Sequence, residues 1–400
     1  MNPKLENMHA LQYTQELVKF PTVSNVSSTS ICDYLEDILK RIAFTTERIE
    51  YTDSAGVNKV NIIGKKGSES GEMSYFAHTD VVSTDPWFSS QHGPFEPTFR
   101  GSTLYGRRSC GMIGSIASML VATEQAAGAE LREPLYIALT ADEELGYRGA
   151  EQVARRSKFF QEIVQGESNG IVGEPTMLNV VHAHKGTYGF KATSHGKAAH
   201  SSTNEGINAN LTMIPFLSEM KRIHDETLED PAWQHPAFDP PGISWNIGIN
   251  DHTKVLNMTA AQSICTVYFR PAPGHDAEAL IERSRKAAAQ CGIDFEVLWA
   301  GQPLYMDPES DFVREVLALS GNEKAQTVSY GTDGAVLTEM KQLVVLGPGD
   351  ITQTHTQDEW ILLDQIEKGK QLYSKLILHW CARRIFWMCL PLSHQHHSED

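Results

Sequence analysis

The sequence predicts a two-domain α/β protein. Its 400 residues are more than one ordinary hydrophobic core usually takes up. Strand-like and helix-like segments alternate in the first part of the chain, which is typical of a sheet covered by helices on both faces. After Val181 the rhythm changes to that of a small α+β unit, and the α/β alternation then resumes. Together these observations predict a larger domain that is interrupted by a smaller one.

The larger domain is expected to begin with two helices, 5–20 and 29–42. Four short apolar segments are bounded by polar residues, as buried strands are: Val60–Gly64, Met73–His78, Leu135–Thr140 and Val344–Gly347. A segment rich in Ala, Met and Leu predicts a helix at 111–127, and the periodicity of 362–380 predicts a last helix. This pattern favours a mixed sheet with helices packed against it.

The smaller unit has its own order of elements. Strands are expected at 188–194, 243–249, 263–270 and 294–298, with helices at 208–227 and 276–291. The order β-α-β-β-α-β is the split βαβ motif of a ferredoxin-like domain. We therefore assign residues 184–297 to an inserted ferredoxin-like domain, called the lid below. Residues 1–183 and 298–400 form the larger domain, with a tail at 382–400 that is expected to be disordered.

Charge and composition exclude several classes of protein. The chain has 34 basic and 50 acidic residues, a net charge of −16, so its surface repels the phosphates of nucleic acids. No apolar run approaches the ~20 residues of a membrane span. The first residues suggest an amphipathic helix rather than a signal peptide. The six cysteines are scattered without CxxC spacing, which favours free thiols and a cytoplasmic location.

Histidine and carboxylate residues follow several of the predicted strands. Such strand ends are where open α/β sheets bind ligands. Histidine nitrogen and carboxylate oxygen are the usual protein ligands of catalytic zinc, and a further carboxylate can act as general base. The candidates are His78, Asp80, Glu143, Glu144, Glu174 and His355. Singly, Asp80 could cap a helix and the two adjacent glutamates could be a solvated pair; together they favour a metal site.

The order of motifs resembles one family of zinc-dependent enzymes. That family includes acetylornithine deacetylase, succinyl-diaminopimelate desuccinylase, aminoacylase-1 and carboxypeptidase G. The resemblance extends from about residue 11 to 377, and Ser109, Cys110 and the GPGD segment resemble acetylornithine deacetylase in particular. Its motifs are HTDVV with DPW downstream, LYGR, TADEELG, GEPT, HKGTYGF, GKAAHSS, FRPAPG, GTDGA, and GPGD followed by HTQDEWI.

The resemblance implies a role for each metal-site candidate. His78 and Glu174 correspond to the terminal ligands of a first metal, and Asp80 to the residue that orients His78. Glu144 and His355 correspond to ligands of a second metal. Glu143 corresponds to the general base that deprotonates the attacking water. The implied cofactor is zinc, one or two ions, with cobalt or manganese as substitutes.

Other positions match residues outside the metal site. His200 corresponds to a histidine that reaches the active site of the neighbouring subunit and stabilises the oxyanion, which implies a homodimer. Asn257 and Arg270 match residues that contact the substrate, and Gly331 and Thr332 belong to a loop that lines its site. Without the resemblance, His200 could equally be a surface histidine, and Arg270 could simply pair with a nearby carboxylate.

The chain departs from the family in one segment. Members of the family have Gly-Arg-Gly-x-x-Asp-Met-Lys-Gly where this sequence has Gly106 to Gly114. Arg108 replaces Gly, Gly111 replaces Asp and Ile113 replaces Lys. The aspartate bridges both metals, so its loss leaves each with two protein ligands, and the charge of Arg108 further opposes cations. Cys110, a soft ligand, could replace the missing group.

Two functions follow from these observations. The first is metal-dependent hydrolysis of an amide bond in N-acyl amino acids or small peptides, impaired by Gly111 or using one metal. The second is that of an inactive homologue that binds a ligand or partner through the same cleft. The complete set of other metal-site residues favours the enzyme. No nucleic acid and no membrane is expected among its partners.

Overall fold

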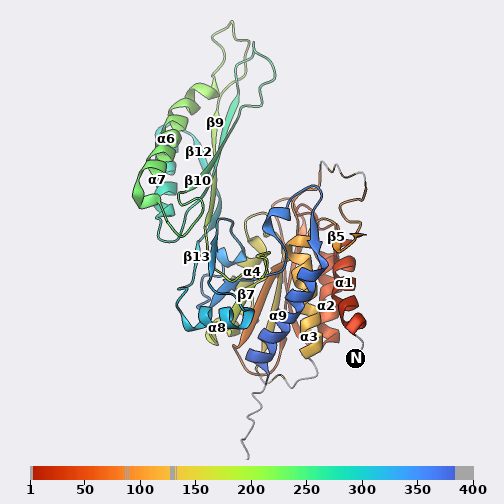
Figure 1. The fold of residues 1–400 in the computed structure, drawn as a ribbon. Coiled ribbons are helices and arrows are strands. Elements are labelled where there is room, and N and C mark those ends of the chain that lie inside the picture. Colours follow the sequence, from red (N-terminus) through yellow and green to blue (C-terminus); the bar gives the residue numbers. More distant parts are fainter. Residues whose placement is uncertain are drawn as a thin grey trace, which may run out of the picture.

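The structure of the protein is a computed structural model. It describes residues 3–382, except for residues 86, 88, 90, 127–130 and 132. The predicted tail, with its histidines at 394, 396 and 397, lies outside the described residues apart from Ala382. Two parts of the molecule stand apart in Figure 1: a broad body around one sheet, and a slender lid.

The body is built on a nine-stranded mixed sheet. Its order is β1-β2-β6-β3-β7-β15-β8-β13, with β14 paired to β8. Neighbouring strands are parallel from β6 to β15 and antiparallel at the β1–β2 edge. The strands are β1 (Thr45–Thr52), β2 (Asn58–Lys66), β3 (Met73–His78), β6 (Leu135–Thr140), β7 (Asn169–Val172), β8 (Val181–His184), β13 (Leu304–Tyr305), β14 (Gln326–Val328) and β15 (Leu343–Val345).

Helices cover both faces of this sheet. Neighbouring residues of a strand point to opposite faces; Tyr75 of β3 contacts Tyr373 of α9, and Phe76 contacts Phe160 of α5. The central strands are consequently buried along their whole length. The body helices are α1 (Pro3–Val18), α2 (Thr29–Arg41), α3 (Gly114–Ala126), α4 (Arg148–Arg156), α5 (Lys158–Gln165), α8 (Asp311–Ser320) and α9 (Leu363–Cys381). Of the described helices, none has the length and apolar character to cross a bilayer.

A second, three-stranded sheet lies beside the start of α3. Its strands are β4 (Thr98–Arg100), β5 (Thr103–Tyr105) and β16 (Trp360–Leu362), in the order β16-β5-β4. The pairing of Trp360 with Tyr105 brings the segment after His355 next to the segment that contains Gly111. A single π-helical turn, Ser109–Ile113, leads directly into α3.

The lid has the predicted ferredoxin-like topology. Its strands pair in the order β10-β11-β9-β12, and every pair is antiparallel. Two helices pack on this sheet over a core separate from that of the body. The elements are β9 (Thr187–His195), α6 (Ala209–Glu229), β10 (Ser244–Asn250), β11 (Gln262–Arg270), α7 (Ala277–Gln290) and β12 (Asp294–Gly301). The lid sheet thus ends at Gly301, beyond residue 297; the domain boundaries remain a prediction.

The mixed α/β fold predicted from the sequence is confirmed. The strands 73–78 and 135–140 have the expected bounds, and the helix expected at 111–127 begins at Gly114, after the π turn. Strand β1, TTERIEYT, was not predicted, because its side chains are mostly polar and partly exposed at the sheet edge. Between α6 and β10 the chain forms one short 3₁₀ turn, Pro231–Trp233.

Gly149, in the first turn of α4, should be one of the least replaceable residues of the body. A Cβ atom there would lie 2.1 Å from the Ala141 carbonyl oxygen and 2.4 Å from Asn61 Oδ1. We expect Gly149→Ala to destabilise the protein by ~1–3 kcal/mol, as overpacking does. Thermal unfolding would show a lower Tm. Gly111→Ala is the control, because its Cβ meets nothing closer than 3.8 Å; equal Tm values for the two variants would contradict the prediction.

Candidate functional site

The candidate residues meet at one edge of the body sheet. His78 ends β3, Glu143 and Glu144 follow β6, and Glu174 follows β7, three neighbouring parallel strands. Their carboxyl ends lie side by side, as expected for ligand sites in such sheets. They border an open cleft of about 300 Å³ between the body and the lid. The cleft also contains His355, Gly111 and Arg108.

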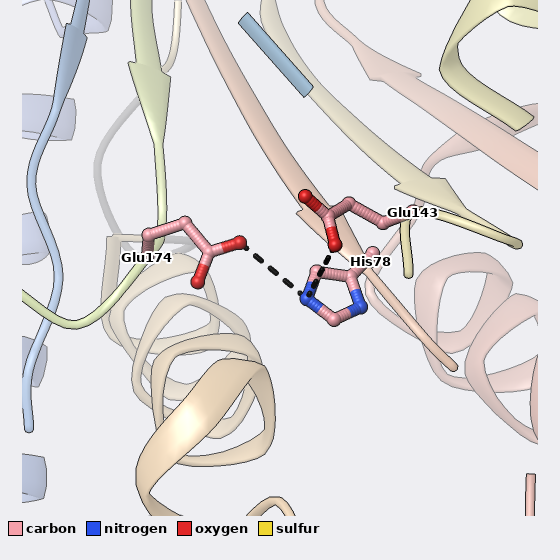
Figure 2. Close-up of side chains that lie close together, drawn as sticks. All are labelled: His78, Glu143 and Glu174. Atoms are coloured by element: carbon pink, nitrogen blue, oxygen red, sulfur yellow. Dashed lines mark ion pairs between the residues drawn. The ribbon is translucent and has the colours of Figure 1, made fainter. Parts of the chain in front are cut away.

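The two ring nitrogens of His78 have different partners. Nδ1 donates to the backbone oxygen of Asp80 at 3.1 Å and lies 3.3 Å from Asp80 Oδ1. Nε2 faces the cleft, 3.4 Å from Glu174 Oε1 and 3.9 Å from Glu143 Oε2 (Figure 2). A metal-binding histidine is typically held in this way, with one nitrogen fixed by an oxygen acceptor and the other left for the ion.

The set His78, Glu143 and Glu174 has the donor atoms of a cation site. One ligand atom from each of the three lies within 4.8 Å of the others, the only such group found among the described residues. A tetrahedral zinc ion with bonds of ~2.1 Å separates its ligand atoms by roughly 3.4 Å. The His78 nitrogen lies 3.4 Å from Glu174 and 3.9 Å from Glu143, so the three residues fit one ion after adjustment of the side chains.

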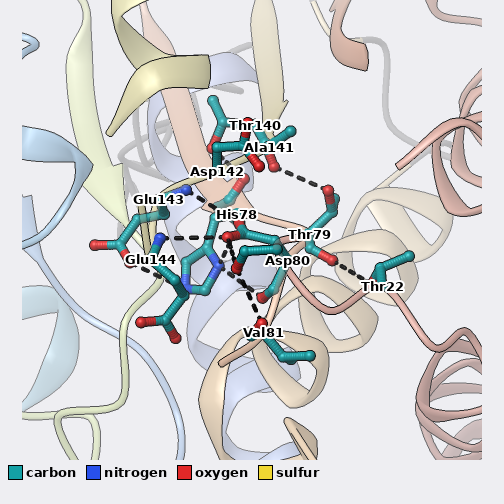
Figure 3. Close-up of polar contacts among 12 residues, drawn as sticks. Thr22, His78, Thr79, Asp80, Val81, Thr140, Ala141, Asp142, Glu143 and Glu144 are labelled. Carbon is teal, nitrogen blue, oxygen red and sulfur yellow. Dashed lines mark hydrogen bonds and ion pairs between the residues drawn. The ribbon is translucent and has the colours of Figure 1, made fainter. Parts of the chain in front are cut away.

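Asp80 joins β3 to the turn that carries both glutamates. Its Oδ1 accepts the backbone N–H of Glu143 at 3.1 Å, and its Oδ2 accepts that of Glu144 at 3.2 Å (Figure 3). Ser24 donates to the same Oδ2 at 2.8 Å. The carboxylate is almost wholly buried. Asp80 therefore positions His78, Glu143 and Glu144 at once, consistent with the orienting role expected for it.

A buried lysine supports the start of this turn. Asp142 has a positive φ of 55°. Its carboxylate lies 2.7 Å from Lys59 Nζ and accepts from the Tyr51 hydroxyl at 2.8 Å. A left-handed residue other than glycine is uncommon and needs such support. These contacts turn the chain sharply after β6, so that the side chains of Glu143 and Glu144 reach the cleft.

The acid cluster is formed by Glu143, Glu144 and Glu174, and the pKa values of Glu143 and of the neighbouring His78 are both shifted. Burial raises the pKa of Glu143 well above its usual range, and repulsion by Glu144 and Glu174 adds to the effect. Burial alone would lower the pKa of His78, but Asp80, Glu174 and Glu143 together raise it well above normal. Burial raises the pKa of Asp333 to about 7. A group of buried carboxylates that resists ionisation favours the binding of a cation.

Glu144 and His355 form a separate pair. Glu144 Oε1 and His355 Nε2 are 2.8 Å apart, a hydrogen-bond distance. The hydrogen bond to Glu144 raises the pKa of His355. The histidine side chain is 57% exposed and the glutamate 15%. These two residues, expected as ligands of a second ion, contact each other directly at the open side of the cleft.

The position of the missing carboxylate is open. Gly111 has φ −62° and ψ −127°, and a Cβ built on it would lie 3.8 Å from Arg108 Cγ and from Glu359 Oε1. Glu359 was not predicted from the sequence, because nothing in the segment DEW distinguishes it from an exposed glutamate. Its Oε1 accepts the backbone N–H groups of Cys110 and Gly111 at 3.2 and 3.1 Å, and Arg107 donates to Oε2 at 3.3 Å. Glu359 therefore anchors the π turn.

Arg108 brings a buried positive charge to the base of the cleft. It is 3% exposed and has a left-handed φ of 71°. Its Nη1 donates to Thr22 Oγ1 at 2.8 Å and to the Thr79 carbonyl, and Nη2 has no hydrogen-bond partner among the described residues. Burial lowers its pKa to about 10, so the guanidinium remains charged at neutral pH. Asp80 and Glu359 are the carboxylates that stabilise this charge most.

The lid side of the cleft is aromatic. Tyr268 and Trp299 pack edge to face, and the guanidinium of Arg270 lies 5.1 Å from the Tyr268 ring. Trp299 lies directly against Gly146, where a Cβ would come within 1.7 Å of the indole. Arg270 and Gly331 border the cleft as expected.

Thr332 does not border it. That residue is fully buried, and its hydroxyl pairs with His184 Nε2 at 3.1 Å and accepts from the Gly334 N–H. The segment turns inward after Gly331, so Thr332 does not line the cleft, and its expected contact with substrate stays a prediction.

His200 and Asn257 are not part of this cleft. They lie in loops of the lid that meet through a β-bridge between His200 and Met258. The His200 side chain is exposed, and its Nδ1 pairs only locally, with Ser202 Oγ at 2.7 Å. Neither residue borders the cleft of its own chain. Their expected roles in catalysis stay predictions.

Cys110 does not point toward the acid cluster. Its Sγ accepts the Asp350 N–H at 3.1 Å and donates to the Asp350 carbonyl at 3.2 Å. Burial raises its pKa far above the usual range, which opposes the thiolate that binds zinc. The hypothesis that Cys110 replaces the missing ligand is not supported by this geometry.

We therefore expect Cys110→Ser to leave the metal content of the purified protein unchanged. Serine keeps both hydrogen bonds to Asp350 and cannot replace a thiolate ligand. Elemental analysis of both proteins, prepared side by side without chelator, tests this. A loss of metal in the serine variant, with an unchanged Tm, would instead identify Cys110 as a ligand.

Comparison with known proteins gives the same result as the motifs. Residues 75–379 match the model of Peptidase family M20/M25/M40. Acetylornithine deacetylase of Myxococcus xanthus is 30% identical over 392 residues, 95% of this chain and 100% of that protein. An M20 metallo-carboxypeptidase of Sulfolobus solfataricus has TM-score 0.74 and 16% identity, over 92% and 98% of the two chains.

A dinuclear metal-binding M20 peptidase of Bacillus subtilis has TM-score 0.61 and 15% identity, over 94% and 98% of the two chains. The fold predicted from the sequence is thus confirmed, and so is its enzyme class, a hydrolase of the metallopeptidase type. With the family motifs in order along one chain and the cleft residues at the expected strand ends, this protein belongs to Peptidase family M20/M25/M40.

Proposed function

We propose that the protein hydrolyses the amide bond of N-acyl amino acids or small peptides, releasing a carboxylate and an amine. The observation that carries this proposal is the convergence of His78, Glu143 and Glu174 in a cleft. The relative from Myxococcus xanthus is named as a deacetylase of an acylated amino acid. The Sulfolobus solfataricus neighbour is a carboxypeptidase. Both names describe cleavage of an amide bond beside a carboxylate.

The residues of the cleft suit this reaction. Water attacks the carbonyl carbon, one of its protons is taken by a carboxylate, and the proton passes to the leaving nitrogen as the C–N bond breaks. Zinc held by the cluster would supply Lewis-acid activation, and cobalt or manganese could replace it. Glu143 and Glu144 are both within the cleft, and the family resemblance gives the proton step to Glu143.

Arg270 is the proposed binding group for the substrate carboxylate. It ends β11 and borders the cleft, and its Nη1 has no hydrogen-bond partner among the described residues. A guanidinium binds a carboxylate through two parallel hydrogen bonds, which fixes the orientation of the substrate. The neighbouring Tyr268 and Trp299 would contact the apolar part of the same molecule.

The proposed assembly is a cytoplasmic homodimer formed through the lid. Exposed apolar side chains cluster on α6, β10 and the loops beside them: Ile207, Leu211, Ile214, Ile249, Val255, Leu256 and Met258. All of them lie between residues 207 and 258, and a concentration of exposed apolar side chains is typical of a protein–protein interface. His200 and Asn257 belong to the same loops. In a dimer they would reach the partner's cleft, and His200 would donate to the oxyanion there.

A second function is that of a homologue that binds ligands without catalysis. The observation in its favour is the open position at Gly111 together with the buried charge of Arg108. The shape of the cleft would be kept in such a protein, but the metal would be lost. Metal content and hydrolysis separate the two functions.

A panel of N-acetyl amino acids and dipeptides tests the proposal directly. We expect release of free amine, measured by reaction with an amine-specific dye, that stops after dialysis against a chelator and returns with zinc, cobalt or manganese. Arg270→Ala should raise KM more than it lowers kcat for substrates that carry a free α-carboxylate. Absence of hydrolysis of the whole panel by the metal-loaded protein would favour the binding function.

The position of His200 predicts complementation between two inactive variants. His200→Ala and Glu143→Gln should each lose activity, and each should remain dimeric. Co-expressed in equal amounts, they should recover about a quarter of normal activity, because half of the dimers are mixed and each mixed dimer has one intact site. Sedimentation verifies the dimers. If the mixture stayed inactive although mixed dimers formed, His200 would not act across the interface.

A further inference from the structure

We infer that this chain holds a single divalent ion, bound by His78, Glu143 and Glu174, and that Glu144 and His355 are not ligands of a second one. The inference rests on the proposed function and assigns its metal site. It reverses the roles that the family resemblance gives to the two adjacent glutamates. The relative from Bacillus subtilis is described as dinuclear.

The geometry of His78, Glu143 and Glu174, called the three-residue group below, fits one ion. His78 Nε2 and Glu174 Oε1 are 3.4 Å apart, the separation of two tetrahedral zinc ligands at ~2.1 Å from the ion. Glu143 Oε2 lies 3.9 Å from the same nitrogen. Three protein ligands with one open position is the usual arrangement of a catalytic zinc. Glu143 thus provides the third ligand that Gly111 does not.

Among the residues that the structure describes, no group completes a second site. Glu144 Oε1 and His355 Nε2 are 2.8 Å apart, closer than the ~3.4 Å between ligands of one tetrahedral zinc ion. Their separation is that of a hydrogen bond. The nearest carboxylate to the missing side chain is that of Glu359, whose oxygens already accept two backbone N–H groups and the Arg107 guanidinium. A pair with no third ligand binds zinc weakly.

The charges of the residues at positions 108 and 111 also favour a single ion. Compared with the family pattern, Gly111 removes one negative charge from the border of the cleft, and Arg108 adds one positive charge. The sum is two positive units, equal to the charge of one divalent ion. The third replacement, Ile113, is in the buried core of the body and does not border the cleft. The two substitutions at the cleft together compensate for one absent cation.

The assignment leaves Glu144 for the proton step. Its carboxylate borders the cleft and is hydrogen-bonded to His355, so it can accept a proton of the attacking water and return it to the leaving nitrogen. Glu143 and Glu144 are neighbours with the same side chain, and both backbone N–H groups are fixed by Asp80. The same substitution at the two positions is consequently a matched comparison.

The experiment measures zinc per chain in the full-length protein and in Glu143→Gln and Glu144→Gln, equilibrated with zinc and desalted. We expect one ion per chain in the unmodified protein and in Glu144→Gln. Glu143→Gln should bind zinc at least tenfold more weakly by titration calorimetry. Two ions in the unmodified protein would overturn the inference, and so would loss of the ion in Glu144→Gln with retention in Glu143→Gln.

Variants at position 111 provide a second test. Gly111→Asp adds a carboxylate where a Cβ meets nothing closer than 3.8 Å, so it should raise the stoichiometry above one, and further when combined with Arg108→Gly. Gly111→Ala is the control and should remain at one. An unchanged stoichiometry in the double variant, with an unchanged Tm, would show that the missing carboxylate is not what excludes a second ion.

Hydrolysis measured on the same samples separates this inference from the proposed function. One bound ion without hydrolysis would support the metal assignment and contradict the function. Hydrolysis with two bound ions would do the reverse. Substitution with cobalt provides an independent signal, because one isolated ion gives no magnetic coupling whereas two bridged ions do. No metal in any variant would contradict the assignment and favour the binding function.

Discussion

The carboxylate of Asp80 is the contact on which the site depends. It lies beside His78 at the end of β3 and accepts both backbone N–H groups of the turn after β6. A carboxylate that accepts several N–H groups keeps its charge even when buried. The pKa of Asp80 is accordingly lowered, although burial alone would raise it; His78 is the main opposing cause. One side chain thereby fixes the ring of His78 and directs the two adjacent glutamates to different partners.

The buried glutamates of the cleft repel one another, and a bound cation would offset this repulsion. Burial and repulsion raise the pKa of Glu143 well above normal, and the charge of His78 opposes this shift. An ion between His78, Glu143 and Glu174 would oppose it further. Arg108 does not take the place of this ion, since its Nη1 is bound to Thr22 and to the Thr79 carbonyl. Its charge is stabilised by Asp80 and Glu359 instead.

The buried strands and the residues that follow them could be predicted from the sequence, because they depend on its apolar pattern and on the order of its motifs. Buried strands such as 73–78 and 135–140 are short apolar runs, and the residues after them fall in the cleft because parallel strands end at one edge. The sequence could not predict contacts decided by side-chain direction. Glu359 differs from any exposed glutamate only by the three N–H groups that surround it, and Thr332 follows Gly331 but turns inward. The partners of Glu143 and Glu144 are likewise decided by the turn.

The backbone at position 111 is held by several contacts of the protein itself. Glu359 holds the π turn by the N–H groups of Cys110 and Gly111, and Cys110 is fixed in turn by Asp350. The backbone at Gly111 is therefore held without any contribution from an ion, and loss of the aspartate does not require the turn to collapse. This rigidity explains how a chain can lose a bridging ligand and keep the cleft, the aromatic wall and the three-residue group intact. The same rigidity leaves room for a side chain at this position, because a Cβ there meets nothing closer than 3.8 Å.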